Sequence, residues 1–325
     1  MTLNRHQFEQ AAKHFRAGRL TLSDFANQLF PKPDEAVEEN AHSDPKPNTD
    51  ATIVQKLPQR KRDAHKGDFG RVLVIGGSQT MPGAIGLTAL AALRTGSGLV
   101  VVITPYDAIN VVAGYSQCYV TEGHDSCEAM AQIQDRLEWA DVIAIGPGMG
   151  QDPAKISFVT QLYKTAPQPI VVDADAINCL AASKVDLKEH EGQRILTPHL
   201  GEFRRLIGAP ITDRDKAEQS ATQFAADNRL VMLLKGAGTF VTDGQSTARN
   251  QTGNPGMATG GSGDVLTGMI ASLIGQGLTP LEAAKTAAHL HGHAGDLAAA
   301  KLGQASLISS DLLDFLPAAI FANQT

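Results

Sequence analysis

Short apolar runs rich in β-branched residues alternate with Ala- and Leu-rich stretches through most of this 325-residue chain. The runs with the length of buried strands stand at 71–77, 99–104, 141–146, 169–175 and 194–199. The stretch between the first two, residues 83–96, has the length of a helix. Because parallel strands need a crossover, usually a helix, this alternation favours βαβ units. We therefore expect a three-layer α/β/α fold with a mostly parallel central sheet.

In a parallel sheet, ligands bind where the carboxyl ends of the strands meet. Each of the five runs ends in glycine, threonine, aspartate or histidine, which are residue types suited to a binding rim. The sequence therefore predicts a ligand site along one edge of the sheet.

The first 50 residues differ from the rest of the chain. Residues 1–30 place apolar side chains, Phe8 and Phe15 among them, at spacings of three and four, which predicts a short helical extension. Residues 31–50 are polar, proline-punctuated and nearly free of large apolar side chains, which is typical of a disordered linker. The catalytic domain is then expected to occupy residues 51–325.

Composition narrows the class of function. A formal net charge of −6 argues against nucleic acid as a partner. No run of about 18 apolar residues is present, so we expect no membrane span. Three cysteines, an odd number without metal-ligand spacing, suit a reducing compartment. We therefore expect a cytoplasmic protein.

The segment Gly260-Gly261-Ser262-Gly263-Asp264, followed by an amphipathic apolar run, carries the strongest chemical signal. Glycines ahead of a helix leave backbone N–H groups uncovered, and these groups together with the positive helix end suit a phosphate. Asp264 would then lie where it can accept a proton from an attacking hydroxyl. The alternative is an ordinary glycine-rich turn in which Asp264 only stabilises the helix start.

This segment resembles the Gly-Gly-Thr/Ser-Gly-Asp signature of the ribokinase-like superfamily, whose aspartate is the catalytic base. Other motifs, which together span nearly all of residues 65–299, are similar to those of the ADP-dependent NAD(P)H-hydrate dehydratases. They are HKGDFGR at 65–71, MPGA at 81–84, GPGMG at 146–150, DADAIN at 173–178, TPHLGEF at 197–203 and LLKGAGT at 233–239.

The resemblance implies a hydro-lyase that repairs nicotinamide nucleotides. It would dehydrate (6S)-NADHX or NADPHX to NADH or NADPH, with ADP as phosphoryl donor, Mg²⁺ as metal, and AMP and phosphate as products. Many such dehydratases are fused to an epimerase domain. Because residues 1–64 are too short to be that domain, we expect a separate NAD(P)H-hydrate epimerase. We also expect a homo-oligomer, with a homotetramer as the predicted form.

The resemblance assigns site residues in three groups. The catalytic residues would be Asp264 and His199. The substrate residues would be Ala84, Gly148, His199 and Asp264. The ADP or AMP residues would be Lys235, Gly236, Ala237, Gly238, Thr239, Asn254, Gly260, Gly261 and Gly263. Without the family, the small residues suggest packing, and residues 235–239 suggest a plain β-hairpin turn.

The motif TPHLGEF separates the dehydratases from their relatives. Vitamin kinases of this superfamily typically have asparagine where this chain has His199, and they keep a glutamate at the place of Glu202. His199 could orient the substrate ring or take a proton, and its alternative is a helix-capping histidine. Glu202 could face Mg²⁺ through a water molecule, or it could be a simple first-turn acid.

Two other functions remain open at this point. An ATP-dependent vitamin kinase of the hydroxymethylpyrimidine or hydroxyethylthiazole type agrees with residues 260–264 but not with the histidine of TPHLGEF. A non-catalytic nucleotide sensor would not need a base at Asp264.

Two motifs resemble a dinucleotide-binding site and a metal site, but their spacing argues against both. GPGMG lacks the spacing of a dinucleotide fingerprint, so nicotinamide is expected as substrate rather than as a bound coenzyme. In the run His289-Leu290-His291-Gly292-His293, the middle histidine falls off the helix face that the other two share, which argues for packing rather than metal binding.

Overall fold

The computed structural model describes residues 55–57, 59–124, 133–211 and 213–324. The predicted helical extension and linker, residues 1–30 and 31–50, lie outside the described residues. The division of the chain at these positions therefore stays a prediction.

A nine-stranded sheet in the order β3-β2-β1-β4-β5-β6-β7-β8-β9 forms the centre of the domain. The strands are β1 Arg71–Ile75, β2 Leu99–Pro105, β3 Val120–His124, β4 Val142–Ile145, β5 Ile170–Val172, β6 Arg194–Leu196, β7 Val231–Leu234, β8 Phe240–Thr242 and β9 Thr247–Arg249. All pairs from β3 to β7 are parallel, and β8 and β9 join antiparallel at one edge. The strand order reverses between β1 and β4, which is the place where open parallel sheets bind ligands.

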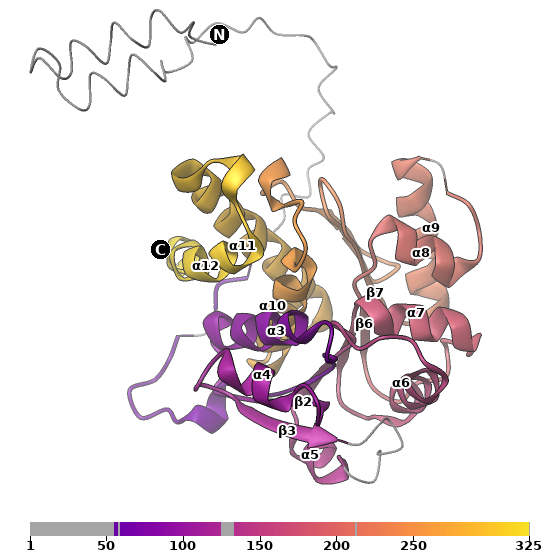
Figure 1. Ribbon diagram of the computed structural model, residues 1–325. Helices are drawn as coiled ribbons and strands as arrows, with labels where there is room; N and C mark the ends of the chain where they lie inside the picture. The colour runs from indigo at the N-terminus through magenta and orange to yellow at the C-terminus, as the bar shows by residue number, and fades with distance from the viewer. Residues whose placement is uncertain (1–54, 58, 125–132, 212, 325) are drawn as a thin grey trace, which may run out of the picture. The chain divides into compact units, whose positions relative to one another are not determined.

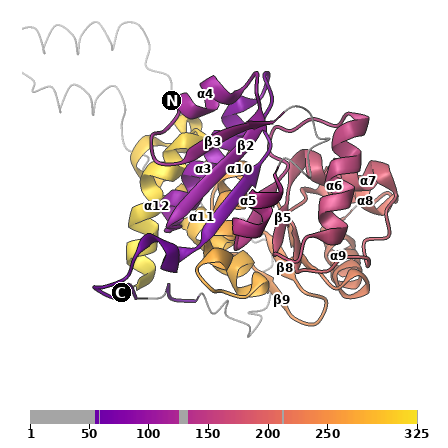
Figure 2. The ribbon, with the colours of Figure 1, turned by 90° about the horizontal axis from the view of Figure 1, so that it is seen from below.

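Helices cover both faces of the sheet, as Figures 1 and 2 show. One layer holds α3 Pro82–Thr95, α4 Ile109–Gly114, α10 Ser262–Gly275, α11 Pro280–Leu302 and α12 Ser309–Gln324. The other holds α5 Gln134–Trp139, α6 Pro153–Thr165, α7 Ala174–Ser183, α8 Leu200–Ile207 and α9 Arg214–Asn228. The expected three-layer α/β/α fold with a mostly parallel sheet is therefore confirmed.

Each strand sends alternate side chains into two separate cores. In β1, Val72 and Val74 join the core under α3 and α10, while Leu73 and Ile75 join the core under α6 and α7. All four side chains are almost fully buried. A strand covered on both faces reads as a continuous apolar run, which is why its sequence shows no polar alternation.

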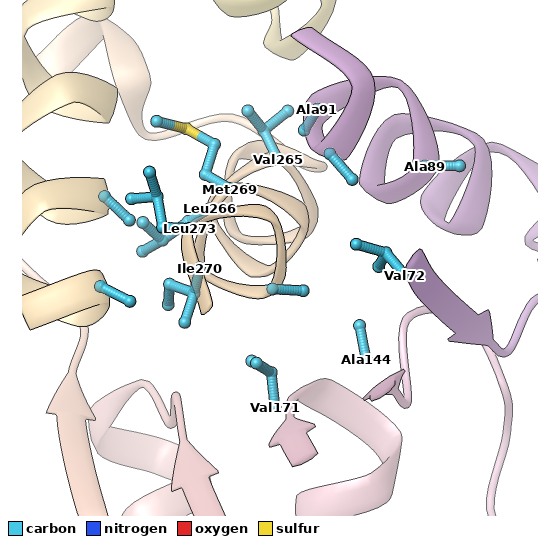
Figure 3. Close-up of a cluster of buried hydrophobic side chains, with 14 of the residues drawn as sticks. Val72, Ala89, Ala91, Ala144, Val171, Val265, Leu266, Met269, Ile270 and Leu273 are labelled. Atoms are coloured by element: carbon cyan, nitrogen blue, oxygen red, sulfur yellow. The ribbon is translucent and has the colours of Figure 1, made fainter. Parts of the chain in front are cut away.

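Helix α10 lies between the sheet and the other helices of its layer. Figure 3 shows Ile270 of α10 on the side that faces the strand residue Val171, and Val265 beside Ala91 of α3. Where α10 passes α3, a side chain on Gly268 would meet the carbonyl oxygen of Thr88 at 2.0 Å. Glycine at this position lets the two helices lie close together, and this contact fixes the position of the α10 N-terminus.

Most differences from the sequence-based expectation concern short or polar strands. The five predicted strands are present, four with shorter bounds and β2 extended by one residue, to Pro105. Strand β3, with the sequence VTEGH, was not predicted. No helix within the described ranges is long and apolar enough to cross a membrane.

Candidate active site

Four parallel strands deliver candidate site residues to one edge of the sheet. The segments after β4, β5, β6 and β7 carry Gly148, Asp173, His199 and Lys235. His199 and Lys235 are joined by a parallel β-bridge. Lys235 Nζ lies 2.6 Å from an Asp173 carboxylate oxygen, so residues 62 positions apart meet here. Residues that follow neighbouring parallel strands therefore lie at one edge of the sheet, where the sequence analysis predicts a ligand site.

The N-terminus of α10 reaches the same place. Gly261 precedes the helix in the left-handed conformation, with φ 93°, and no side chain in the described part of the chain caps the helix start. A side chain on Gly260 would meet open space. Because the first N–H groups of a helix have no intrahelical partner, this turn can hold phosphoryl oxygens.

Asp264 lies in the first turn of α10, in an environment that raises its proton affinity. Burial and then the nearby Asp173 carboxylate raise the pKa of Asp264 to about 7, and Lys235 opposes this change. A carboxyl group that titrates near neutrality is suited to proton transfer at pH 7. This environment supports the general-base hypothesis over that of a simple helix-stabilising acid.

Asp173, to which the sequence analysis assigns no role, organises the buried side of the site. Its carboxylate accepts hydrogen bonds from Thr197 Oγ1 at 2.8 Å and Thr267 Oγ1 at 2.7 Å, besides its contact with Lys235. Burial alone would lower the pKa of Lys235, but Asp173 and Glu202 outweigh burial and raise it. The only sequence signal for Asp173 was its position at the end of an apolar run.

His199 caps helix α8 and is half-exposed. The N–H groups of Gly201 and Glu202 donate to its Nδ1 at 2.9 and 3.2 Å. A ring nitrogen that accepts hydrogen bonds carries no proton, so the proton of the neutral ring is on Nε2. In this arrangement Nε2 donates and is not a base. His199 therefore caps α8, as the capping alternative predicts. The geometry supports a role in orienting the substrate ring rather than in proton abstraction.

Glu202 is buried, and both of its carboxylate oxygens have protein partners. The His199 N–H donates to Oε2 at 2.8 Å, Lys235 Nζ lies 3.9 Å from the same oxygen, and His199 Nε2 lies 3.5 Å from Oε1. Within the described ranges, no group of three His, Cys, Asp or Glu side chains could hold a metal ion. These residues fit Mg²⁺ only as an ion that arrives with nucleotide phosphates and faces Glu202 through water.

Ala84 and Gly148 meet where α3 begins beside the loop after β4. Gly148 has φ 64°, and a side chain there would lie 3.1 Å from the Ala84 Cβ and 2.5 Å from the Met81 carbonyl oxygen. One turn further along α3, the Leu87 side chain lies against Gly261. Ala84 and Gly148 are therefore neighbours, and α3 lies against the glycine turn that precedes α10.

Residues 235–239 form the hairpin loop between β7 and β8. The plain hairpin expected from the residues alone is present, and it is held in place from outside the loop. Arg214, the first residue of α9, donates to the carbonyl oxygens of Leu234, Lys235 and Gly238. This anchoring arginine was not predicted, and its hydrogen bonds hold the loop in one position.

Asn254 holds the loop that precedes α10. Its side-chain oxygen accepts from the Gly256 N–H at 3.0 Å, and its Nδ2 donates to Asp296 at 2.9 Å. The Gly253 N–H also donates to Asp296. These contacts point to a supporting role for the Asn254 side chain.

The three histidines of α11 do not form a metal site. His291 is buried, and its Nε2 lies 2.9 Å from the carbonyl oxygen of Ser262. Burial lowers the pKa of His291 to about 4, so it is neutral at pH 7. His289 and His293 pair on another face, with ring centroids 6.1 Å apart. The packing interpretation is supported, and His291 also stabilises the first turn of α10.

Comparison with known proteins agrees with this geometry. The family model of NAD(P)H-hydrate dehydratase matches residues 72–318. A bifunctional NAD(P)H-hydrate repair enzyme of Moorella thermoacetica is 46% identical over 280 residues, which are 83% of this chain and 52% of that protein. The ADP-dependent (S)-NAD(P)H-hydrate dehydratase of Bacillus subtilis is 34% identical over 274 residues, or 83% of this chain and 95% of that protein.

A solved structure gives the same result in three dimensions. The ADP/ATP-dependent NAD(P)H-hydrate dehydratase of Bacillus subtilis, co-crystallised with ATP and Mg²⁺, matches with a TM-score of 0.72 at 32% identity. The match covers 82% of this chain and 95% of that one. The chain spans about half the length of the bifunctional relatives that it matches. It belongs to the NAD(P)H-hydrate dehydratase family, a family of lyases with the ribokinase-like fold.

Proposed function

We propose that this chain catalyses the ADP-dependent dehydration of (6S)-NADHX and NADPHX to NADH and NADPH, with AMP and phosphate as the other products. One observation carries the proposal: a half-buried carboxyl group with a raised pKa, that of Asp264, follows directly on an uncovered glycine turn that suits phosphoryl oxygens. The substrate hydroxyl can then receive a phosphoryl group held at the glycine turn while it gives its proton to Asp264. The name of the Bacillus subtilis relative supports ADP as the donor and the (S)-hydrate as the substrate.

The first step activates the substrate hydroxyl. Hydroxide is a poor leaving group, so the hydroxyl on carbon 6 attacks the β-phosphorus of ADP, and the bond between that phosphorus and the bridging oxygen breaks to release AMP. Asp264 takes the proton of the attacking hydroxyl, while the N–H groups around Gly261 and Gly263 hold phosphoryl oxygens. The product of this step is a phosphate ester on carbon 6.

The second step is elimination. The lone pair of the ring nitrogen expels phosphate from carbon 6, and transfer of the carbon-5 proton to the departing phosphate restores the dihydronicotinamide. His199, whose Nε2 is a donor in this geometry, orients the ring. Ala84 and Gly148 present no bulky side chain at the place where a flat ring would lie.

Mg²⁺, when bound with the nucleotide, would offset phosphate charge. Glu202 is the residue that would face the ion through water. Lys235, Gly236, Ala237, Gly238 and Thr239 form the fixed loop that we propose binds ADP, together with the loop held by Asn254.

We extend the proposal to the organisation of the protein. A catalytic domain that begins near residue 51 is supported by the family match from residue 72 and by site residues that all lie between 84 and 264. The bifunctional relatives support an epimerase as the pathway partner. We also propose a cytoplasmic homo-oligomer, with a homotetramer as its form. Exposed apolar side chains near α4, Tyr106, Val111 and Tyr115, are suitable for a subunit contact.

Incubation of the pure protein with hydrated NADH and Mg²⁺ tests the activity. With ADP present, the near-ultraviolet absorbance of NADH should reappear, and AMP and phosphate should accumulate in equal amounts. Parallel reactions contain ATP alone or no nucleotide. Recovery of NADH without any nucleotide, or with ATP but not with ADP, would contradict ADP as the donor. Phosphorylation of hydroxymethylpyrimidine or hydroxyethylthiazole by ATP, without dehydration, would favour the vitamin-kinase alternative.

A further inference from the structure

The side chain of Lys235 leaves the loop to which its backbone belongs. Lys235 is the first residue of the β7–β8 hairpin loop, and its backbone N–H donates to the carbonyl oxygen of Pro198, which follows β6. Its ammonium group instead lies inside the site, 2.6 Å from Asp173 Oδ1 and 3.9 Å from Glu202 Oε2. A side chain on Gly263 would meet Lys235 Nζ at 3.1 Å. The ammonium group therefore lies against the first turn of α10, beside the glycine turn that suits phosphate.

Asp173 is built to hold this ammonium group in one place. Its carboxylate is 1% exposed, and hydroxyl groups fix both of its oxygens. Thr197 donates to Oδ1, which also contacts the ammonium group, and Thr267 donates to Oδ2. Ala174, the next residue, has φ 50°, a conformation that residues other than glycine rarely adopt. Such backbone persists only where its surroundings require it, and it often marks functional sites.

The charge balance gives the ammonium group a purpose beyond pairing with Asp173. The charged groups that act most strongly on Asp264 are the carboxylates Asp173, Glu202 and Asp175 and the cation Lys235. Without Lys235, the charged groups that act most strongly on Asp264 would all be carboxylates, which would repel the phosphoryl group. A fixed cation aimed at the place where charge develops is a common source of phosphoryl-transfer catalysis.

We propose that Lys235 is a catalytic residue, whose ammonium group stabilises the phosphoryl group in transfer, and that Asp173 is a positioning residue that holds this ammonium group at the α10 turn. The inference rests on the proposed ADP-dependent reaction. It separates Lys235 from residues 236–239, which contact the nucleotide only as a loop. It also gives the site a cation that belongs to the protein, besides any ion that arrives with the nucleotide.

The test uses the full chain and compares Lys235→Ala, Asp173→Asn and the double variant in the ADP-dependent assay. Lys235→Ala should lower kcat by about 10²- to 10³-fold, as loss of a transition-state donor does, with a smaller change in KM for ADP. Asp173→Asn should lower kcat by roughly tenfold or more. Because Asp173 is proposed to act through Lys235, the double variant should match Lys235→Ala within about twofold. A purely structural Asp173 would instead give additive losses.

Methylammonium provides a second readout that does not depend on the Asp173 variant folding. The Lys235 side chain is 19% exposed, so a small amine can reach the space left by Lys235→Ala. Methylammonium should restore part of kcat in Lys235→Ala and leave the unmodified chain unchanged. The matched control is Lys164→Ala, which removes an ion pair with Glu189 on the surface and should keep full activity.

The outcomes separate the two proposals. If the unmodified chain forms no NADH with ADP, the proposed function fails. If it does form NADH and Lys235→Ala retains kcat within about threefold, the role of Lys235 is wrong. Additive losses in the double variant, or no rescue by methylammonium in a folded Lys235→Ala protein, would overturn the inference as well.

Discussion

Asp264→Asn is expected to lower kcat for ADP-dependent dehydration by about 10²- to 10⁴-fold, with little change in affinity for ADP. The substitution keeps the shape of the side chain and removes its ability to take a proton from the attacking hydroxyl. Steady-state kinetics, with ADP binding measured by calorimetry, would check both parts. Asp215→Asn is the matched control, because Asp215 is an exposed acid in the first turn of α9. Near-normal turnover in Asp264→Asn would return Asp264 to the role of a helix-stabilising acid.

Asp264→Asn lowers activity, but it should raise the stability of the fold relative to the unmodified protein at higher pH. The pKa of Asp264 is raised from 3.8 to about 7 in the folded protein, so between these values the folded state binds more protons than the unfolded state. Stability from this group is therefore full below about pH 4 and is lost as pH rises through 7. The variant has no such loss. Relative to the unmodified protein, its free energy of unfolding should rise by about 2 kcal/mol between pH 5 and pH 8.

Arg194→Met is expected to destabilise the fold by about 3–5 kcal/mol. The guanidinium group is 1% exposed and donates to the carbonyl oxygens of Tyr163, Ala166, Gln168 and Gln193. Burial lowers the pKa of Arg194 to about 10, so the side chain is charged at pH 7. Removal takes a donor from each of these carbonyl oxygens, of which Gln193 keeps the Ile170 N–H as a donor. It also releases the end of α6 from β6, the strand that leads to His199.

Urea unfolding of the variant and the unmodified protein measures this effect. Arg205→Met is the control, because Arg205 is exposed and donates to Asn178 on the surface. Its substitution should change the free energy of unfolding by less than about 1 kcal/mol. A comparably small loss in Arg194→Met would show that water replaces the guanidinium group and that the arginine does not anchor the sheet.

The layers of this fold could be predicted because buried parallel strands have a strong sequence signal. Strand β1 is apolar on both faces, so the run at 71–77 predicts a buried strand. Strand β3, with the sequence VTEGH, has no such signal, and it pairs with β2 at the edge of the sheet. The short strands β8 and β9 likewise depend on the hairpin after β7.

Part of the candidate site could likewise be predicted from the sequence, and part could not. The glycine turn and Asp264 are contiguous in sequence, so their relation could be predicted. The meeting of Lys235 with Asp173 joins residues 62 positions apart and depends on neighbouring strands, a relation that local patterns do not contain. For His199, the sequence left a choice between capping and chemistry. The structure shows that capping fixes the ring tautomer, and this in turn limits the chemistry open to it.

In the proposed reaction, the hydroxyl oxygen of the substrate leaves as part of phosphate. Hydrated NADH prepared in oxygen-18 water carries the label in its carbon-6 hydroxyl, and the reaction is then run with unlabelled ADP in ordinary water. Mass spectrometry of the released phosphate should find one oxygen-18 for each NADH formed, because the carbon–oxygen bond breaks after phosphoryl transfer. Unlabelled phosphate with the label released into water would contradict the account.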